Sequence, residues 1–289
     1  MLPPLKPWNM KSLKLGLTGP KIQQPVPLIT LTTDFGTDGI FVGCMKGVIY
    51  GINPKVNIVD ITHSIASYDR VEAAFLVKSF SGDFPSSSIH IVVVDPGVGS
   101  ARKPLLIQTV HGLYLGPDNG VFTPILMEGK PRVREITQKR YFRPAIGATF
   151  HGRDLFAPVA AWLSKGVPPQ QMGPIYPNPM TISIPKPERI RSNRIKGIVM
   201  YIDHFGNLIT NITWKNLEQL VGSNVFEKIH VKLSGRDYGV LKKNYSETPE
   251  GKVGALMNSF GELEVFCYKG NAQKRLRLKK GSSVEVFRV

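Results

Sequence analysis

Hydrophobic and polar positions in the first half of the chain follow two alternating patterns. Short, nearly continuous apolar runs predict buried strands at 27–33, 57–62 and 89–94. Apolar residues at helical spacing predict a helix over 40–51, and a second helix after Asp69, which has Glu72 three residues later as a helix start often does. This order of strands and helices predicts a parallel sheet covered by helices on both faces.

Further along, the pattern predicts two more features of the same domain. Residues 105–109 and 113–115 are expected to form a hairpin around His111-Gly112. Apolar residues between Leu155 and Leu163 predict a helix that stops near Gly166. Together these elements predict a Rossmann-like α/β catalytic domain over 28–185.

The pattern changes after a stretch rich in proline. Prolines cluster from Pro168 to Pro187, and we expect a linker that ends near Arg194. One helix is expected at 214–221, and short alternating segments predict strands at 197–202, 207–212, 229–233, 263–266 and 283–287. The interpretation is an α/β fold followed by a small antiparallel β-barrel domain over 195–289.

Residues 1–27 form a basic, proline-containing arm with neither the apolar stretch of a secretory signal nor the composition of a transit peptide. No apolar run of about 18 residues occurs, so no transmembrane helix is expected. Cys44 and Cys267, the two cysteines, indicate neither a disulfide scaffold nor a paired-cysteine zinc site. A cytoplasmic protein is predicted.

The net charge of +16 raises nucleic-acid binding as a function. The excess lies in the arm and in 130–143, 186–196 and 269–280. In the last of these, Lys274 to Lys280 alternate with leucines as in a strand with one solvated face. A solvated surface is therefore favoured over a nucleic-acid site.

Four polar clusters follow predicted strands, and they begin at Thr32, Asp60, Asp95 and Pro117. The carboxyl ends of parallel strands form the usual ligand crevice, although each cluster alone also fits a turn. His151 lies directly before a predicted helix, where it is either a site residue or a core histidine.

Common enzyme signatures are missing from the sequence. Residues 97–102 read GVGSAR, so the third glycine of the dinucleotide fingerprint is Arg102, and neither a P-loop nor a GxSxG elbow occurs. No two histidines have the i,i+4 spacing of a helical metal site. Dehydrogenase, P-loop NTPase and serine hydrolase functions are not favoured.

Seven motifs, taken together and in order, resemble the S-adenosylmethionine hydroxide adenosyltransferases, a family related to the fluorinase and chlorinase enzymes. They are LTTDFG (31–36), DITHSI (60–65), VVVDPGVGS (92–100), GPDNG (116–120), TFHGRDLFAP (149–158), IDHFGN (202–207) and Asn258-Ser259. The resemblance spans about 28–289. The seven motifs are specific to this family only when taken together, since no single one of them would be.

The resemblance implies hydrolysis of S-adenosyl-L-methionine to adenosine and L-methionine by SN2 attack of water on ribose C5′. It also implies a homotrimer with active sites between subunits, with no metal and no cofactor, S-adenosylmethionine being the substrate. The implied catalytic residues are Asp95, Arg102 and His151. The implied substrate contacts are Asp34 on the ribose hydroxyls, Tyr68 and Phe150 beside the nucleoside, and Asp203, Phe205, Asn207 and Ser259 on the methionine and adenine parts.

Three other functions stay open at this point. The halogenating relatives carry tyrosine in place of Asp95 and lack His151, and a carboxylate at the nucleophile site would repel a halide. Water is therefore favoured over chloride or fluoride. A nucleoside- or nucleic-acid-binding protein and a methyltransferase are the alternatives from other classes, the latter without the glycine-rich strand-to-helix loop.

Overall fold

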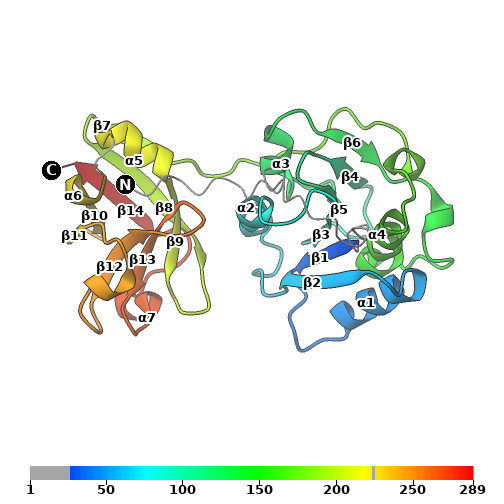
Figure 1. The fold of residues 1–289 in the computed structure, drawn as a ribbon, viewed down its shortest axis with the longest axis horizontal. Helices are drawn as coiled ribbons and strands as arrows, with labels where there is room; N and C mark the ends of the chain where they lie inside the picture. The colour runs from blue at the N-terminus through cyan, green and yellow to red at the C-terminus, as the bar shows by residue number, and fades with distance from the viewer. Residues whose placement is uncertain (1–26, 223–224, 289) are drawn as a thin grey trace, which may run out of the picture. The chain divides into compact units, whose positions relative to one another are not determined.

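The computed structural model describes residues 27–222 and 225–288, so the predicted N-terminal arm lies outside the described residues apart from its last position. The chain divides into two compact units, with the boundary between Ile182 and Ser183 (Figure 1). Throughout the described part, no helix combines the length and hydrophobicity needed to cross a membrane. Each unit is described by itself below.

A six-stranded mixed sheet forms the centre of the first unit. Its order is β2 (Asn57–Thr62), β1 (Leu28–Thr33), β3 (Ile89–Val93), β5 (Leu113–Pro117), β4 (Pro104–Gln108) and β6 (Arg132–Glu135). The first four strands are parallel, whereas β4 runs antiparallel to both β5 and β6. The α/β class and the hairpin are confirmed. The parallel arrangement expected for the strands at 27–33, 57–62 and 89–94 is confirmed too. In the hairpin, the tight turn closed by Thr109 N–H on the Gly112 carbonyl (3.0 Å) reverses the chain between neighbouring strands.

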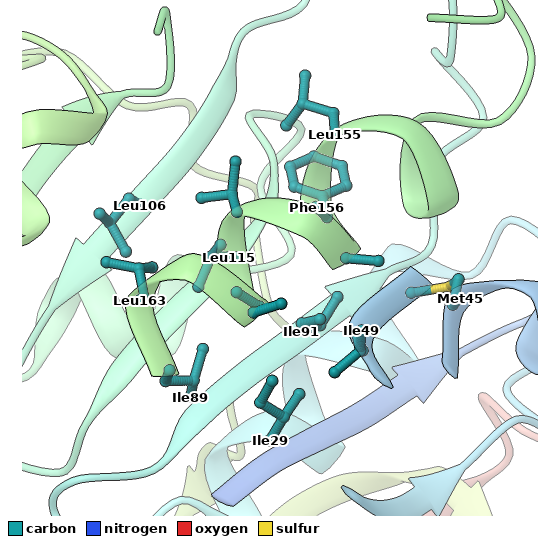
Figure 2. Close-up of a cluster of buried hydrophobic side chains, with 14 of the residues drawn as sticks. Ile29, Met45, Ile49, Ile89, Ile91, Leu106, Leu115, Leu155, Phe156 and Leu163 are labelled. Atoms are coloured by element: carbon teal, nitrogen blue, oxygen red, sulfur yellow. The ribbon is translucent and has the colours of Figure 1, made fainter. Parts of the chain in front are cut away.

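Helices cover both faces of this sheet, each through its own hydrophobic cluster. α1 (Phe41–Ile52) and α4 (Ala157–Ser164) pack on one face, and Figure 2 shows Met45, Ile49 and Leu163 around Ile91 there. α2 (Arg70–Phe80) and α3 (Thr123–Met127) pack on the other face, against Val92. Side chains of β3 point alternately to the two faces, so four of its five residues are apolar, and the fifth, His90, is buried as well.

The predicted start of α2 is confirmed. The Asp69 carboxylate accepts a hydrogen bond from the Glu72 N–H (2.8 Å) and caps the helix. The Glu72 carboxylate accepts from the N–H of Ala66 (3.3 Å), so it fixes the loop that precedes the helix. The N-terminus of α2 is therefore fixed by two side chains, one before the helix and one in its first turn.

The proline-rich stretch is not a free linker. It contains a 3-10 turn, η4 (Pro169–Met172), and the following residues are hydrogen-bonded to the first unit. Asp118 accepts from the Tyr176 hydroxyl (3.0 Å) and from the Met180 N–H (2.6 Å). The stretch also holds β7 (Glu188–Arg191), which pairs with β8. The hydrogen bonds to Asp118 and the pairing of β7 with β8 therefore fix this stretch at both of its ends.

The second unit is built on an eight-stranded antiparallel sheet that curls into a nearly closed barrel. Its main order is β11 (Arg236–Val240), β10 (Ile229–Leu233), β14 (Ser283–Arg288), β8 (Arg194–Ile202), β9 (Leu208–Thr213), β13 (Glu262–Cys267) and β12 (Val253–Met257). The chain just after β11 meets β12 where the Lys242 N–H donates to the Ala255 carbonyl (2.8 Å). The predicted barrel and the helix α5 (Trp214–Val221) are confirmed.

The basic segment near the C-terminus differs from its prediction. Residues expected as a strand form α7 (Ala272–Leu276), and a second short helix is α6 (Val225–Lys228). The Asn271 side chain accepts from the Lys274 N–H (2.7 Å), and Arg277 takes a left-handed conformation with φ of 54°. A cap at each end outweighs the alternating pattern over so few residues.

Candidate active site

The carboxyl edge of the first sheet gathers the loops that carry Asp34 and Asp95. β1 and β3 are parallel neighbours, and Thr33 stands opposite Val93 in their register. Asp34 is the next residue after β1, and Asp95 follows two residues after β3. The two carboxylates therefore come from adjacent strands at one edge, as ligand-binding loops do in open α/β sheets.

Arg102 links the three residues predicted to handle water. Its Nε donates to Oδ1 of Asp95 (3.1 Å), and its Nη2 donates to the other oxygen of that carboxylate. The same Nη2 lies 2.8 Å from Nδ1 of His151. The side chains of Arg102 and Asp95 are 8% and 4% exposed, so this contact is shielded from solvent. Asp95, Arg102 and His151 form one connected cluster.

Hydrogen-bond chemistry fixes the roles of the His151 nitrogens. A guanidinium only donates, so Nδ1 of His151 accepts and the neutral ring carries its proton on Nε2. Burial lowers the pKa of His151 and the charge of Arg102 lowers it further, while Asp95 and Asp154 oppose the shift. His151 is therefore neutral at pH 7, with Nε2–H directed away from Arg102.

One donor of this cluster has no partner within the described part of the chain. Nη1 of Arg102 is buried and makes no hydrogen bond to any residue in 27–222 or 225–288. An unpaired buried donor on a charged group is unfavourable, and a bound water or ligand oxygen relieves it. Nη1 is thus the atom of Arg102 that can hold a reactant beside Asp95.

Asp154 fixes the segment that carries His151. A π-helical turn, η3 (Gly152–Phe156), follows His151 directly and leads into α4. The fully buried Asp154 carboxylate accepts from Arg153 (2.6 Å), from Arg143 (3.2 Å) and from the Gly147 N–H (2.9 Å). Asp154 was not among the predicted site residues, although its place in the HGRD motif was an available signal.

The predicted nucleoside contacts of the first unit also lie near one another. Oδ2 of Asp34 accepts a hydrogen bond from the backbone N–H of Tyr68 (2.9 Å). Tyr68 has φ of 67°, uncommon for a bulky residue, and its side chain is exposed. Phe150 packs edge-on against Phe35 and Phe41, with ring centroids 5.9 and 5.3 Å apart. Asp34 thus holds Tyr68, and an aromatic cluster flanks His151.

The remaining predicted contacts lie in two turns of the second unit. The Asn207 backbone N–H (2.8 Å) and side-chain amide (3.0 Å) both donate to Asp203, which closes a turn with Phe205 exposed at its tip. Ser259 lies in another exposed turn, where the Asn258 side chain accepts from two backbone N–H groups, those of Phe260 and Glu262.

Glu264, which the sequence analysis missed, interacts with both of these turns. Burial raises the pKa of this carboxyl group, and the charge of Asp203 adds to the shift, while hydrogen bonds from Tyr245 and Asn258 oppose it. The Tyr245 hydroxyl donates to Glu264 across 2.9 Å. Its position among the apolar residues of the predicted strand at 263–266 could have indicated a buried carboxylate.

The described part of the chain brings no three or more His, Cys, Asp or Glu side chains together in a metal-binding arrangement. That no metal takes part stays a prediction.

Comparison with known proteins places both units. Residues 29–173 match the SAM hydroxide adenosyltransferase N-terminal domain, and residues 197–285 match the C-terminal domain of the same family. The (R)-S-adenosyl-L-methionine hydrolase of Methanocaldococcus jannaschii is 35% identical over 275 residues, covering 90% of this chain and 95% of the relative. A fluorinase of Nocardia brasiliensis is 25% identical over 290 residues, covering 90% of this chain and 96% of the relative.

Solved structures agree with the sequence comparison. The crystal structure of an uncharacterized conserved protein from Thermotoga maritima has a TM-score of 0.84 and 32% identity, covering 90% of this chain and 100% of that chain. The family resemblance noted in the sequence is confirmed. This chain belongs to the SAM hydroxide adenosyltransferase family.

Proposed function

We propose that this protein hydrolyses S-adenosyl-L-methionine to adenosine and L-methionine by attack of water on ribose C5′. The observation that carries the proposal is the connected, shielded Asp95–Arg102–His151 cluster at the carboxyl edge of the sheet. Membership of the family supports it, as do relatives named (R)-S-adenosyl-L-methionine hydrolase at 31–35% identity.

The reaction needs no acid to assist the leaving group, but it needs an accurately positioned water. The sulfonium leaves as a neutral thioether, so sulfur needs no proton, whereas water is a weak nucleophile that must be held in line with C5′. As the bond between the water oxygen and C5′ forms, the C5′–S bond breaks and its electron pair leaves on the sulfur of methionine. A proton of the attacking water passes to Asp95 and then to solvent. Arg102 holds that carboxylate in place, and its free Nη1 can orient the water.

Halide chemistry is the alternative within the family, since fluorinases are among the relatives. A halide is an anion, so a carboxylate beside its site repels it unless an excess of positive charge remains there. Here both oxygens of Asp95 pair with Arg102, which cancels the positive charge of the guanidinium. The charge balance of the cluster therefore favours neutral water over an anion.

Substrate binding is part of the proposal. Asp34 uses Oδ2 on Tyr68, which leaves Oδ1 for the vicinal ribose hydroxyls. Tyr68 and Phe150 supply aromatic contacts to the nucleoside. In the second unit, the proposed contacts to the methionine and adenine parts are Asp203, Phe205, Asn207 and Ser259. The reaction as written uses no cofactor.

A product assay in heavy-oxygen water tests the activity. Purified protein incubated with S-adenosylmethionine in halide-free buffer should release adenosine and methionine in equal amounts, with the label in the adenosine 5′-hydroxyl. Asp95→Ala and His151→Ala should bind substrate without turnover. A folded protein that releases neither product contradicts the proposal, 5′-chloroadenosine in added chloride supports halide chemistry, and S-adenosylhomocysteine supports a methyltransferase.

We also propose a cytoplasmic homotrimer with active sites between subunits. The free thiols of Cys44 and Cys267 fit a reducing compartment. Light scattering on the purified protein tests the trimer. Restored activity on mixing an Asp95→Ala variant with a variant defective only in the second unit tests whether the sites are shared.

A further inference from the structure

A chain of polar contacts runs from the protein surface to the turn that carries Asp34. His63, 6% exposed, follows β2 directly, and its Nδ1 lies 2.8 Å from Oγ1 of Thr33. Its Nε2 lies 3.1 Å from Oδ1 of Asp60, at an angle outside good hydrogen-bond geometry, and has no other polar partner among the residues described. Oδ2 of Asp60 pairs with Lys46 at 2.5 Å.

Along these contacts, from Thr33 through His63 to Asp60, each hydrogen-bond donor faces an acceptor. The Phe35 N–H donates to Oγ1 of Thr33 (3.2 Å), which leaves the Thr33 hydroxyl proton for Nδ1 of His63. The ring then carries its own proton on Nε2, toward the Asp60 carboxylate. Burial raises the pKa of Asp60, but the hydrogen bond from Lys46 and the close contact with His63 outweigh it and lower the pKa, so this anchor stays ionised.

His63 holds the 33–36 turn at two points. Its side chain contacts Thr33 at the start of the turn, and its backbone carbonyl accepts from the Gly36 N–H (2.8 Å) at the end. Gly36 has φ of 72°, a conformation in which a side chain would be strained. Asp34 lies between these two points, and its carboxylate in turn fixes Tyr68.

The order acid, histidine, hydroxyl also occurs in nucleophilic triads, but a nucleophile is ruled out here. Thr33 is fully buried, and its oxygen already contacts both the Phe35 N–H and His63. No substrate atom reaches it, so the network acts on the shape of the turn and not on a bond of the substrate.

We propose that Asp60, His63 and Thr33 form a positioning network that sets the Asp34 carboxylate for the ribose hydroxyls. The proposal rests on the proposed function, which gives Asp34 this ligand. His63 touches neither substrate nor water. Its loss displaces one charge-assisted contact to the ribose diol and leaves the Asp95–Arg102–His151 cluster intact.

Calorimetry with two nucleosides tests the network. Adenosine offers the ribose diol, whereas 2′,3′-dideoxyadenosine lacks it and has the same base. His63→Ala should weaken adenosine binding about tenfold, as for one misplaced charge-assisted hydrogen bond, and leave dideoxyadenosine binding unchanged. KM for S-adenosylmethionine should rise more than kcat falls. His63→Asn, which keeps an acceptor for Thr33, should restore part of the affinity.

A matched control is available in the second unit. His230 also pairs with an aspartate, Asp237, at 2.8 Å, but on the surface of the barrel. His230→Ala should change neither nucleoside affinity. Should His63→Ala fail to fold, Asp60→Asn gives the same comparison, because it removes the charged anchor of the ring and otherwise breaks only the pair with Lys46.

A double-mutant cycle decides between positioning and general structure. In an Asp34→Ala background, His63→Ala should cause no further loss of adenosine affinity. The network is overturned if His63→Ala weakens the binding of both nucleosides equally. It is also overturned if His63→Ala causes its full loss of adenosine affinity in the Asp34→Ala background. Absence of turnover in the wild type contradicts the proposed function instead. A wild type that does not prefer adenosine overturns the role of Asp34, and with it this proposal.

Discussion

Nη2 of Arg102 donates to Nδ1 of His151 across 2.8 Å while the same guanidinium holds both oxygens of Asp95. One planar group therefore orients the carboxylate and the imidazole relative to each other. Neither Asp95 nor His151 is oriented independently, because Arg102 holds both side chains. Losses from single substitutions in this cluster should be far from additive.

Replacing Arg102 by lysine keeps the charge and removes the planar fork. A single ammonium cannot align Asp95 and His151 together, so Arg102→Lys should lower kcat by about 10²-fold, the effect of a misplaced reacting group. Product release measured by chromatography checks this. Arg134→Lys is the control, because Arg134 hydrogen-bonds the Gly173 carbonyl (3.0 Å) and takes no part in the cluster. An Arg102→Lys variant within twofold of wild type contradicts the alignment argument.

The pH dependence of turnover should follow His151. Burial and the charge of Arg102 lower its pKa below 6.5, so the neutral ring persists below that pH. As the pH falls through the lowered pKa, Nδ1 gains a proton. It can then no longer accept the hydrogen bond from Arg102, and two positively charged donors face each other. We expect kcat to stay level down to pH 6.5 and to fall at more acidic pH.

Titration of the histidines by NMR tests the cause of this shift. Arg102→Met removes the positive charge and frees Asp95, so the pKa of His151 should rise relative to wild type. A wild-type pKa at or above 6.5 contradicts the inferred neutral state.

Asp154 should stabilise the first unit. Asp154→Asn removes the charge that pairs with Arg153 and Arg143 and places an amide N–H toward one of these donors. We expect a loss of about 2 kcal/mol in the free energy of unfolding, as for hydrogen bonds to a buried charged group. Urea unfolding followed by circular dichroism measures it.

The pH dependence of this loss has a definite sign. Burial raises the pKa of Asp154, but its hydrogen bonds from Arg153, Gly147 and Arg143 outweigh burial and lower the pKa below the usual 3.8. Its stabilising contribution is therefore full above pH 3.8 and is lost as the pH falls through the lowered value. The difference between wild type and Asp154→Asn should be constant from pH 7 to pH 5. A difference that grows toward acid contradicts this assignment.

The sequence predicts best those elements whose pattern reflects burial. β3 is apolar on both faces because helices cover both, so its run of five buried residues is readable directly. β6, with the sequence RVRE, has three charged residues in four and escapes the same reasoning. α7 was misassigned because the side-chain cap at Asn271 and the left-handed backbone of Arg277 decide so short a segment.

The candidate site shows a similar division. The family resemblance implied that Asp95, Arg102 and His151 act together, and the structure brings them into contact. The pairing of His63 with Thr33 was not predictable, because the two residues are 30 positions apart and meet through the register of β1 with β2. Spacing along the chain carries no information about such contacts across a sheet.

Two glycines of the second unit separate the cost of backbone strain from the cost of a steric clash. Gly206 and Gly239 both have φ of 83°, so alanine at either position is strained by the same backbone conformation. A Cβ at Gly206 would lie 2.1 Å from the Asn271 side chain that caps α7, whereas a Cβ at Gly239 meets nothing within 4 Å.

Gly239→Ala should therefore cost about 1 kcal/mol, from the left-handed backbone alone. Gly206→Ala should cost a further 1–3 kcal/mol, roughly the cost of overpacking, because Asn271 must leave its cap. It should also raise KM for S-adenosylmethionine, since the same turn carries Asp203 and Asn207. Thermal unfolding and steady-state kinetics on both variants check this. Equal destabilisation by the two substitutions would show that the 203–207 turn adjusts freely and does not depend on contact with α7.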